Sequence, residues 1–270
     1  MSSIDVPLKG SGFGSTHRKD NWWVEPLLIF LGYLAFILYA NYAVFYPNCP
    51  NGNLCYVVEG TGYLSPMYSP TLMETAPSWW PGFLPFSAAM LILWAPAGFR
   101  FTCYYYRGAY YKGWWADPPS CAVGEPNFRG KNYRGERKWP LLIQNIHRYF
   151  LYIAIIFIAI LSYDAWRGLW FDGPNGPETQ LGLGLGSIIL ILNPILLGLY
   201  TFGCHAFRHL IGGRKDIMSD SGLTKKCYDC VSSMNRSHMK WAWISMFYVA
   251  FVDIYIRLCA SGTIVDWRIL

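Results

Sequence analysis

Five apolar runs of about 20 residues follow one another along the chain, separated by polar or basic segments. A run of this length crosses a hydrocarbon layer of about 30 Å when it forms a helix. We therefore predict an all-α fold, an integral membrane bundle of five transmembrane helices. The predicted spans cover residues of about 23–46, 80–103, 141–163, 181–204 and 241–260.

The segment before the first span is polar and rich in glycine and serine. It lacks the apolar stretch of a cleavable signal peptide, so insertion is expected to rely on the first span itself. We predict residues 1–21 as a cytoplasmic tail and residues 22–270 as a single transmembrane domain. Composition agrees, because 53% of the residues are hydrophobic and only 14% are charged, against about 25% charged in an average soluble domain.

Basic residues are unevenly distributed among the loops. Residues 104–140 and 205–240 hold seven Lys or Arg each, whereas residues 46–78 hold none. This asymmetry is typical of cytoplasmic basic loops, so it predicts a cytoplasmic N-terminus, an external C-terminus and a multi-pass protein of the cell inner (plasma) membrane. Anionic lipid headgroups and partner subunits explain the net charge of +6 better than nucleic acid does.

Two polar pairs have a structural interpretation. Cys49 and Cys55 lie in the loop predicted to face outward, where their spacing permits a small disulfide-closed turn, although free thiols are equally compatible with the sequence. Asp253 and Arg257 lie four residues apart in the last span, so their side chains can neutralise each other at membrane depth. A structural pair is the favoured interpretation, with a proton relay as the alternative.

Residues suited to metal binding gather at the predicted cytoplasmic boundary. His205 and His209 are four residues apart, which on a helix directs both imidazoles from one face. Two His and two Cys converging on one place are the ligand set of a Rieske-type 2Fe-2S centre. A haem b between His147 and His205 is the alternative, and hydrogen bonding or simple packing is the interpretation without a metal. The boundary set is Cys103, Cys121, His147, Cys204, His205 and His209.

Aromatic and polar residues near the same boundary suit a quinone, which needs an apolar slot and a few hydrogen-bond donors. An interfacial belt of Trp and Tyr is an equally good explanation. The candidate quinone-binding residues are Tyr105, Tyr106, Arg107, Trp114, Trp115, Asp117, Arg148 and Tyr149. Cys227 and Cys230 form a CxxC motif in the second basic loop, with no second CxxC beside it to complete a zinc site.

Several stretches in order resemble the membrane anchor subunit of actinobacterial-type succinate dehydrogenase, from about Trp22 onward. They are FRFTCYYYRGAYY, PPSCAVGEP, LLIQNIHRYF, CHAFRHLIGG and HMKWAW. The resemblance implies a subunit of a succinate:quinone oxidoreductase, in which partner subunits oxidise succinate and no catalytic residue lies on this chain. It also implies a flavoprotein subunit and an iron-sulfur subunit as partners, in a complex able to oligomerise.

The resemblance further implies electron transfer to menaquinone or another quinone through a membrane-embedded Rieske-type 2Fe-2S cluster. The ligands it suggests are Cys103, Cys121, His205 and His209, with His147 as the alternate. A haem b cytochrome of this or another quinone-linked dehydrogenase is the second hypothesis. A non-redox membrane scaffold is the third.

Overall fold

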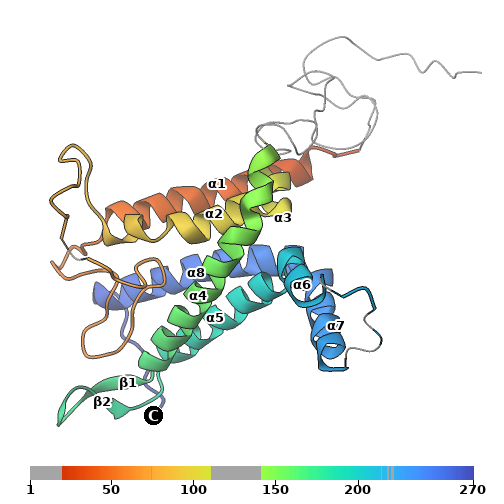
Figure 1. The fold of residues 1–270 in the computed structure, drawn as a ribbon. Coiled ribbons are helices and arrows are strands. Elements are labelled where there is room, and N and C mark those ends of the chain that lie inside the picture. Colours follow the sequence, from red (N-terminus) through yellow and green to blue (C-terminus); the bar gives the residue numbers. More distant parts are fainter. Residues whose placement is uncertain (1–19, 74, 111–140, 214, 218, 220–221) are drawn as a thin grey trace, which may run out of the picture. The chain divides into compact units, whose positions relative to one another are not determined.

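The computed structural model describes residues 20–73, 75–110, 141–213, 215–217, 219 and 222–270. Within them the chain is mostly helical, as the apolar runs predict, and it has one antiparallel pair of strands, β1 (Trp170–Gly173) and β2 (Gly176–Leu181). The helices are α1 (Val24–Phe45), α2 (Trp94–Thr102), α3 (Tyr104–Gly108), α4 (His147–Arg167), α5 (Leu185–Phe202), α6 (His205–Gly212), α7 (Gly222–Arg236) and α8 (His238–Ala260), with 3₁₀ helices at Ala88–Leu91 and Leu141–Ile146 (Figure 1).

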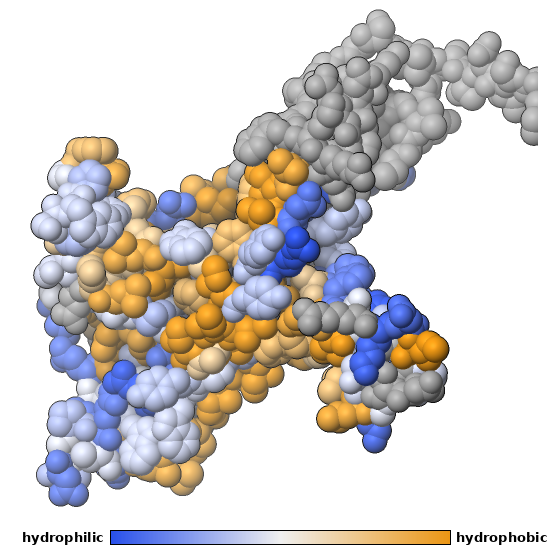
Figure 2. All heavy atoms as spheres, in the orientation of Figure 1, coloured by the Kyte–Doolittle hydropathy of each residue, from blue (hydrophilic) through white to orange (hydrophobic). Residues whose placement is uncertain are grey.

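Four helical segments of the described residues are long and apolar enough to cross a membrane: Val24–Phe45, Leu142–Arg167, Leu185–Phe202 and His238–Ala260. They correspond to four of the five predicted spans. Large apolar side chains remain exposed along them, as on Ile156 and Ile195, and orange apolar atoms cover much of the surface in Figure 2. Exposed apolar stripes of this kind are the surface that lipid covers.

The span predicted over residues 80–103 is not confirmed as one long helix. Pro81 and Pro85 fix their own backbone angles and disfavour a helical conformation for the residues before them, and regular structure begins only at the 3₁₀ turn Ala88–Leu91. The helix α2 that follows has nine residues and ends at Thr102. The prolines of this run predict a kinked helix, but its residues before Ala88 form no helix.

The chain forms two compact units, which we describe separately. The first comprises residues 1–37 and 100–146, and the second comprises residues 38–99 and 147–270. In the first unit Tyr106 is fully buried, its hydroxyl accepts a 2.6 Å hydrogen bond from Arg100, and its ring centroid lies 5.7 Å from that of Tyr33. The single domain predicted for residues 22–270 stays a prediction.

The second unit is built on α4, α5 and α8, in which α5 packs against both α4 and α8 (Figure 1). Its core joins side chains of α5 and α8 with Tyr63 and Phe171 from the intervening loop and β1. The Tyr63 hydroxyl donates a 2.7 Å hydrogen bond to Asp266 and accepts one from the Ser187 backbone N–H. Burial, together with the hydrogen bond to Asp266, raises the pKa of Tyr63. This tyrosine therefore ties the loop to the start of α5.

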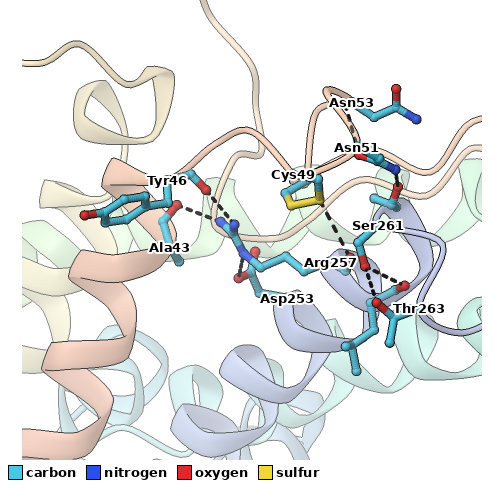
Figure 3. Close-up of a disulfide and its surroundings, with 12 residues drawn as sticks. Ala43, Tyr46, Cys49, Asn51, Asn53, Asp253, Arg257, Ser261 and Thr263 are labelled. Atoms are coloured by element: carbon cyan, nitrogen blue, oxygen red, sulfur yellow. Dashed lines mark hydrogen bonds and ion pairs between the residues drawn. A yellow bond between two sulfur atoms is a disulfide. The ribbon is translucent and has the colours of Figure 1, made fainter.

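The loop after α1 packs on the C-terminal end of α8 (Figure 3). Cys49 and Cys55 are joined by a disulfide, and the Asn51 side chain donates a 2.9 Å hydrogen bond to the Ala260 carbonyl. Arg257 donates hydrogen bonds to the carbonyls of Ala43 and Tyr46, which lie in and just after the last turn of α1. The loop without basic residues therefore lies at the opposite end of α8 from its first residue, His238.

Candidate redox centre

A histidine and a cysteine from different helices meet inside the second unit. The Nε2 atom of His147, the first residue of α4, lies 3.1 Å from the Sγ atom of Cys204. Cys204 is only 3% exposed. Imidazole nitrogen and thiolate sulfur are both ligands of zinc, copper and iron-sulfur centres. The pair thus places two donor atoms side by side at one end of the helix bundle.

The break between α5 and α6 directs the Cys204 side chain. Helix α5 is closed by Gly203, whose carbonyl accepts a 2.8 Å hydrogen bond from the Asn235 side chain. A Cβ atom on Gly203 would lie 2.6 Å from the Leu199 carbonyl oxygen and 3.3 Å from Met234 of α7, so glycine suits this crowded turn. Cys204 then has an extended backbone and serves as the N-cap of α6. The Cys204 thiol is therefore held at the break between α5 and α6.

An aromatic ring fixes the orientation of the imidazole. Phe99 stacks on His147 with ring centroids 4.5 Å apart and planes inclined by 9°. One residue earlier, Gly98 leaves room for Phe150 of α4, because a Cβ atom there would lie 2.3 Å from that ring. This close contact of α2 with α4 sets Phe99 against the face of His147.

Ring contacts lead from Phe99 through Tyr200 to a buried histidine, His238. The ring centroid of Tyr200 lies 5.4 Å from that of Phe99, with the planes inclined by 62°, and 5.0 Å from that of His238, with the planes inclined by 17°. His238 is 2% exposed and begins α8. The ends of α4, α5 and α8 therefore each bring one donor residue to the same end of the unit: His147, Cys204 and His238.

His205 and His209 form a separate pair on α6. Their Nε2 atoms are 3.1 Å apart, as the four-residue spacing predicts, and both side chains are exposed. Partial burial lowers the pKa of His205, and the neighbouring His209 and Arg208 lower it further. In the described part of the chain, no group of three or more His, Cys, Asp or Glu side chains could hold a metal ion.

The other two predicted cysteine ligands are a residue of the first unit and one outside the described residues. Cys103 belongs to the first unit, is 2% exposed, and is the N-cap of α3 with an extended backbone like that of Cys204. Cys121 lies outside the described residues, as do Trp114, Trp115 and Asp117 of the predicted quinone site.

The described quinone candidates are divided between the two units. In the first, Tyr106 is bonded to Arg100, Tyr105 is partly exposed, and Arg107 lies 5.1 Å from the ring of Tyr104. In the second, Arg148 lies 5.2 Å from the ring of Tyr149, and both side chains are exposed. Each arginine thus contacts an aromatic ring by a cation–π interaction.

The boundary set predicted from the sequence included Cys204, but the ligands suggested by the resemblance did not, and His238 was in neither set. Their positions relative to the predicted spans could have identified them. His147 lies near the start of the third span, Cys204 at the end of the fourth and His238 just before the fifth, and these three places fall on one side of the membrane in the predicted topology. The four-residue spacing of His205 and His209 instead predicted ligands on α6, where both side chains are exposed.

Long apolar helices define a multi-pass membrane protein, in which the half-buried imidazole of His147 meets the buried thiol of Cys204. Residues 24–262 match a sequence model described as actinobacterial succinate dehydrogenase subunit SdhC, and the chain belongs to this family. It is therefore a membrane subunit of a succinate dehydrogenase complex.

A solved structure supports the same assignment. The chain is similar to one in the structure titled "Mycobacterium smegmatis Sdh1 complex in the apo form", with 38% sequence identity, 100% of each chain covered and a TM-score of 0.81. No curated protein matches the chain.

Proposed function

We propose that the chain passes electrons from an iron-sulfur subunit of succinate dehydrogenase to membrane quinone through a Rieske-type 2Fe-2S cluster. The observation that carries the proposal is the 3.1 Å approach of His147 Nε2 to Cys204 Sγ in a buried part of a membrane subunit. A flavoprotein subunit that oxidises succinate would complete the complex, which is able to oligomerise.

The donor types present fit such a cluster. A Rieske-type cluster takes two imidazoles and two thiolates, and it supplies a one-electron carrier with a raised reduction potential. His147 and Cys204 would hold it. The buried His238 is the candidate for the second imidazole, although in the described residues no third such side chain groups with that pair. Cys103 and Cys121, the two thiolates of the sequence-based set, stay the candidates for the second thiolate.

The surrounding side chains prepare these ligands. Phe99 covers one face of His147 and restricts rotation of its ring, while Gly203 fixes the turn that presents the Cys204 thiol. Ligation requires the thiolate, so binding of the cluster would release the thiol proton. Cys204 is buried and His147 is half-buried, which limits the access of water to the donor atoms.

The topology follows from charge and from the disulfide. Residues 46–78 lack Lys and Arg and contain the disulfide-closed turn, both of which suit the external side. If residues 46–78 are external and the basic loop 104–140 is cytoplasmic, the chain crosses the membrane between these two segments. Residues 88–102 would form this short second crossing. With five crossings the N-terminus is cytoplasmic and the C-terminus is external.

Quinone would bind near the cytoplasmic boundary. The candidates remain Tyr105, Tyr106, Arg107, Arg148 and Tyr149, together with Trp114, Trp115 and Asp117 outside the described residues. The arginines and tyrosines supply hydrogen-bond donors for quinone carbonyls, and the rings supply apolar contact. Menaquinone or another quinone would meet these needs.

The test compares matched cysteine variants of the purified complex. Cys204→Ser should abolish the electron paramagnetic resonance signal of a reduced 2Fe-2S centre beyond those of the iron-sulfur subunit. Cys259→Ser, which alters another buried cysteine in the core around Tyr63, should keep it. An unchanged signal in Cys204→Ser would remove Cys204 from the ligands.

A pyridine haemochrome spectrum of the same preparation separates the cluster from a haem. A stoichiometric haem b signal would replace the cluster with a cytochrome. If the preparation contained neither haem nor an iron signal from the membrane domain, the chain would be a non-redox membrane scaffold.

A further inference from the structure

Helix α6 presents two imidazoles that the buried centre does not use. His205 and His209 project from the same exposed face, and their rings are nearly perpendicular, with an interplanar angle of 86°. Their Nε2 atoms lie 3.1 Å apart, within hydrogen-bonding distance of each other, so both nitrogens occupy one place on this exposed face.

This distance matches two ligands of one metal ion. With a metal–nitrogen bond of about 2.1 Å, two nitrogens 3.1 Å apart subtend an angle of about 95° at the ion. Square-planar and octahedral coordination both require angles of about 90°, and they are typical of Cu²⁺ and Ni²⁺. Tetrahedral Zn²⁺ would need only a small adjustment of the rings.

The local structure holds the pair in place. The Arg208 side chain lies between the two histidines in sequence but bonds to α7, with Nη2 2.6 Å from the Tyr228 hydroxyl and its guanidinium 4.8 Å from the ring centroid. Its charge is thereby directed to the neighbouring helix. At the end of α6, Gly213 leaves space beside His209, because a Cβ atom there would lie 3.2 Å from the ring nitrogen Nδ1.

We propose that His205 and His209 form a surface site for a divalent late transition-metal ion, distinct from the buried centre of His147 and Cys204. Water would complete the coordination, since in the described residues no third His, Cys, Asp or Glu joins the pair. Copper, nickel and zinc are the ions whose imidazole affinity suits such a site. The proposal does not depend on the identity of the buried cofactor.

The test uses the whole succinate dehydrogenase complex, purified with a tag that contains no histidine. Binding of Ni²⁺ and Cu²⁺ is measured by equilibrium dialysis and expressed as ions per copy of this chain. One ion above the background of the double variant His205→Gln/His209→Gln is expected. Each single variant should weaken binding by more than about tenfold, because even changes to residues that only orient metal ligands cost about 10–100-fold.

Leu210→Gln is the matched control, because it alters an exposed residue on the same helix without removing a donor. Its metal binding should equal that of the unaltered complex. Equal binding by the unaltered complex and the double variant would overturn the site. Loss of the 2Fe-2S signal in His205→Gln would also overturn it, by making the pair part of the redox centre, while leaving the proposed electron-transfer function intact.

Discussion

Asp253 and Arg257 form a buried ion pair one turn apart on α8, with 2.7 Å between Arg257 Nε and Asp253 Oδ2. The carboxylate also accepts hydrogen bonds from Tyr39 and Ser65, and the guanidinium bonds to the carbonyls of Ala43 and Tyr46. The pair therefore joins α1, the loop after it and α8. This arrangement agrees with the structural interpretation of the two charges, because their bonding groups are engaged in holding these segments together.

Replacing one partner of this pair should destabilise the subunit strongly. Asp253→Asn leaves the Arg257 charge buried without its counter-ion, and breaking a buried pair in this way costs about 3–5 kcal/mol. The midpoint of thermal unfolding in detergent measures the loss. The control is Asp229→Asn, which breaks the exposed pair with Lys225 on α7 and should cost about 0.3–0.5 kcal/mol. Equal shifts in the two variants would contradict the structural role of Asp253.

The disulfide between Cys49 and Cys55 should stabilise the end of the bundle that it covers. The cysteines are six residues apart, and closing so small a loop contributes about 2 kcal/mol in the chain-entropy treatment. Cys49→Ser/Cys55→Ser should therefore lower the thermal midpoint, as should a reducing agent acting on the unaltered protein. Cys227→Ser changes an exposed thiol and should leave the midpoint unchanged. A reducing agent should have no effect on the double variant, and any such effect would point to another bond.

Phe99 should influence the redox centre through His147, without being a ligand. Phe99→Leu removes the ring stacked at 4.5 Å and frees the imidazole to rotate. Changes to residues that orient metal ligands cost about 10–100-fold in affinity or activity, so quinone reduction should fall by about tenfold and the cluster's g values should shift. Phe251→Leu, on an exposed part of α8, should do neither. Reduced activity with unchanged g values would assign Phe99 a packing role only.

The sequence predicted the structure correctly where a property repeats along one helix. The apolar length of α1 and α8 predicted their existence and nearly their ends, and the spacing of His205 and His209 predicted that their rings would meet. It failed where a few residues interrupt a pattern, as Pro81 and Pro85 do in the second apolar run. The contact between His147 and Cys204 joins residues 57 apart and depends on a turn at Gly203, so no periodic pattern could reveal it.

The orientation in the membrane can be tested with the exposed cysteines of α7. Cys227 and Cys230 are free and exposed, and their loop is predicted to face the cytoplasm because of its basic residues. A membrane-impermeant maleimide should modify them in inverted vesicles and leave them unmodified in right-side-out vesicles. The Cys227→Ser/Cys230→Ser variant shows how much of the labelling belongs to these two thiols. This control is needed because Cys121, in the other basic loop, lies outside the described residues. Labelling of these two thiols from the external side would reverse the topology and place the donor residues His147 and Cys204 at the outer surface, where an electron-donating cytoplasmic subunit could not reach them.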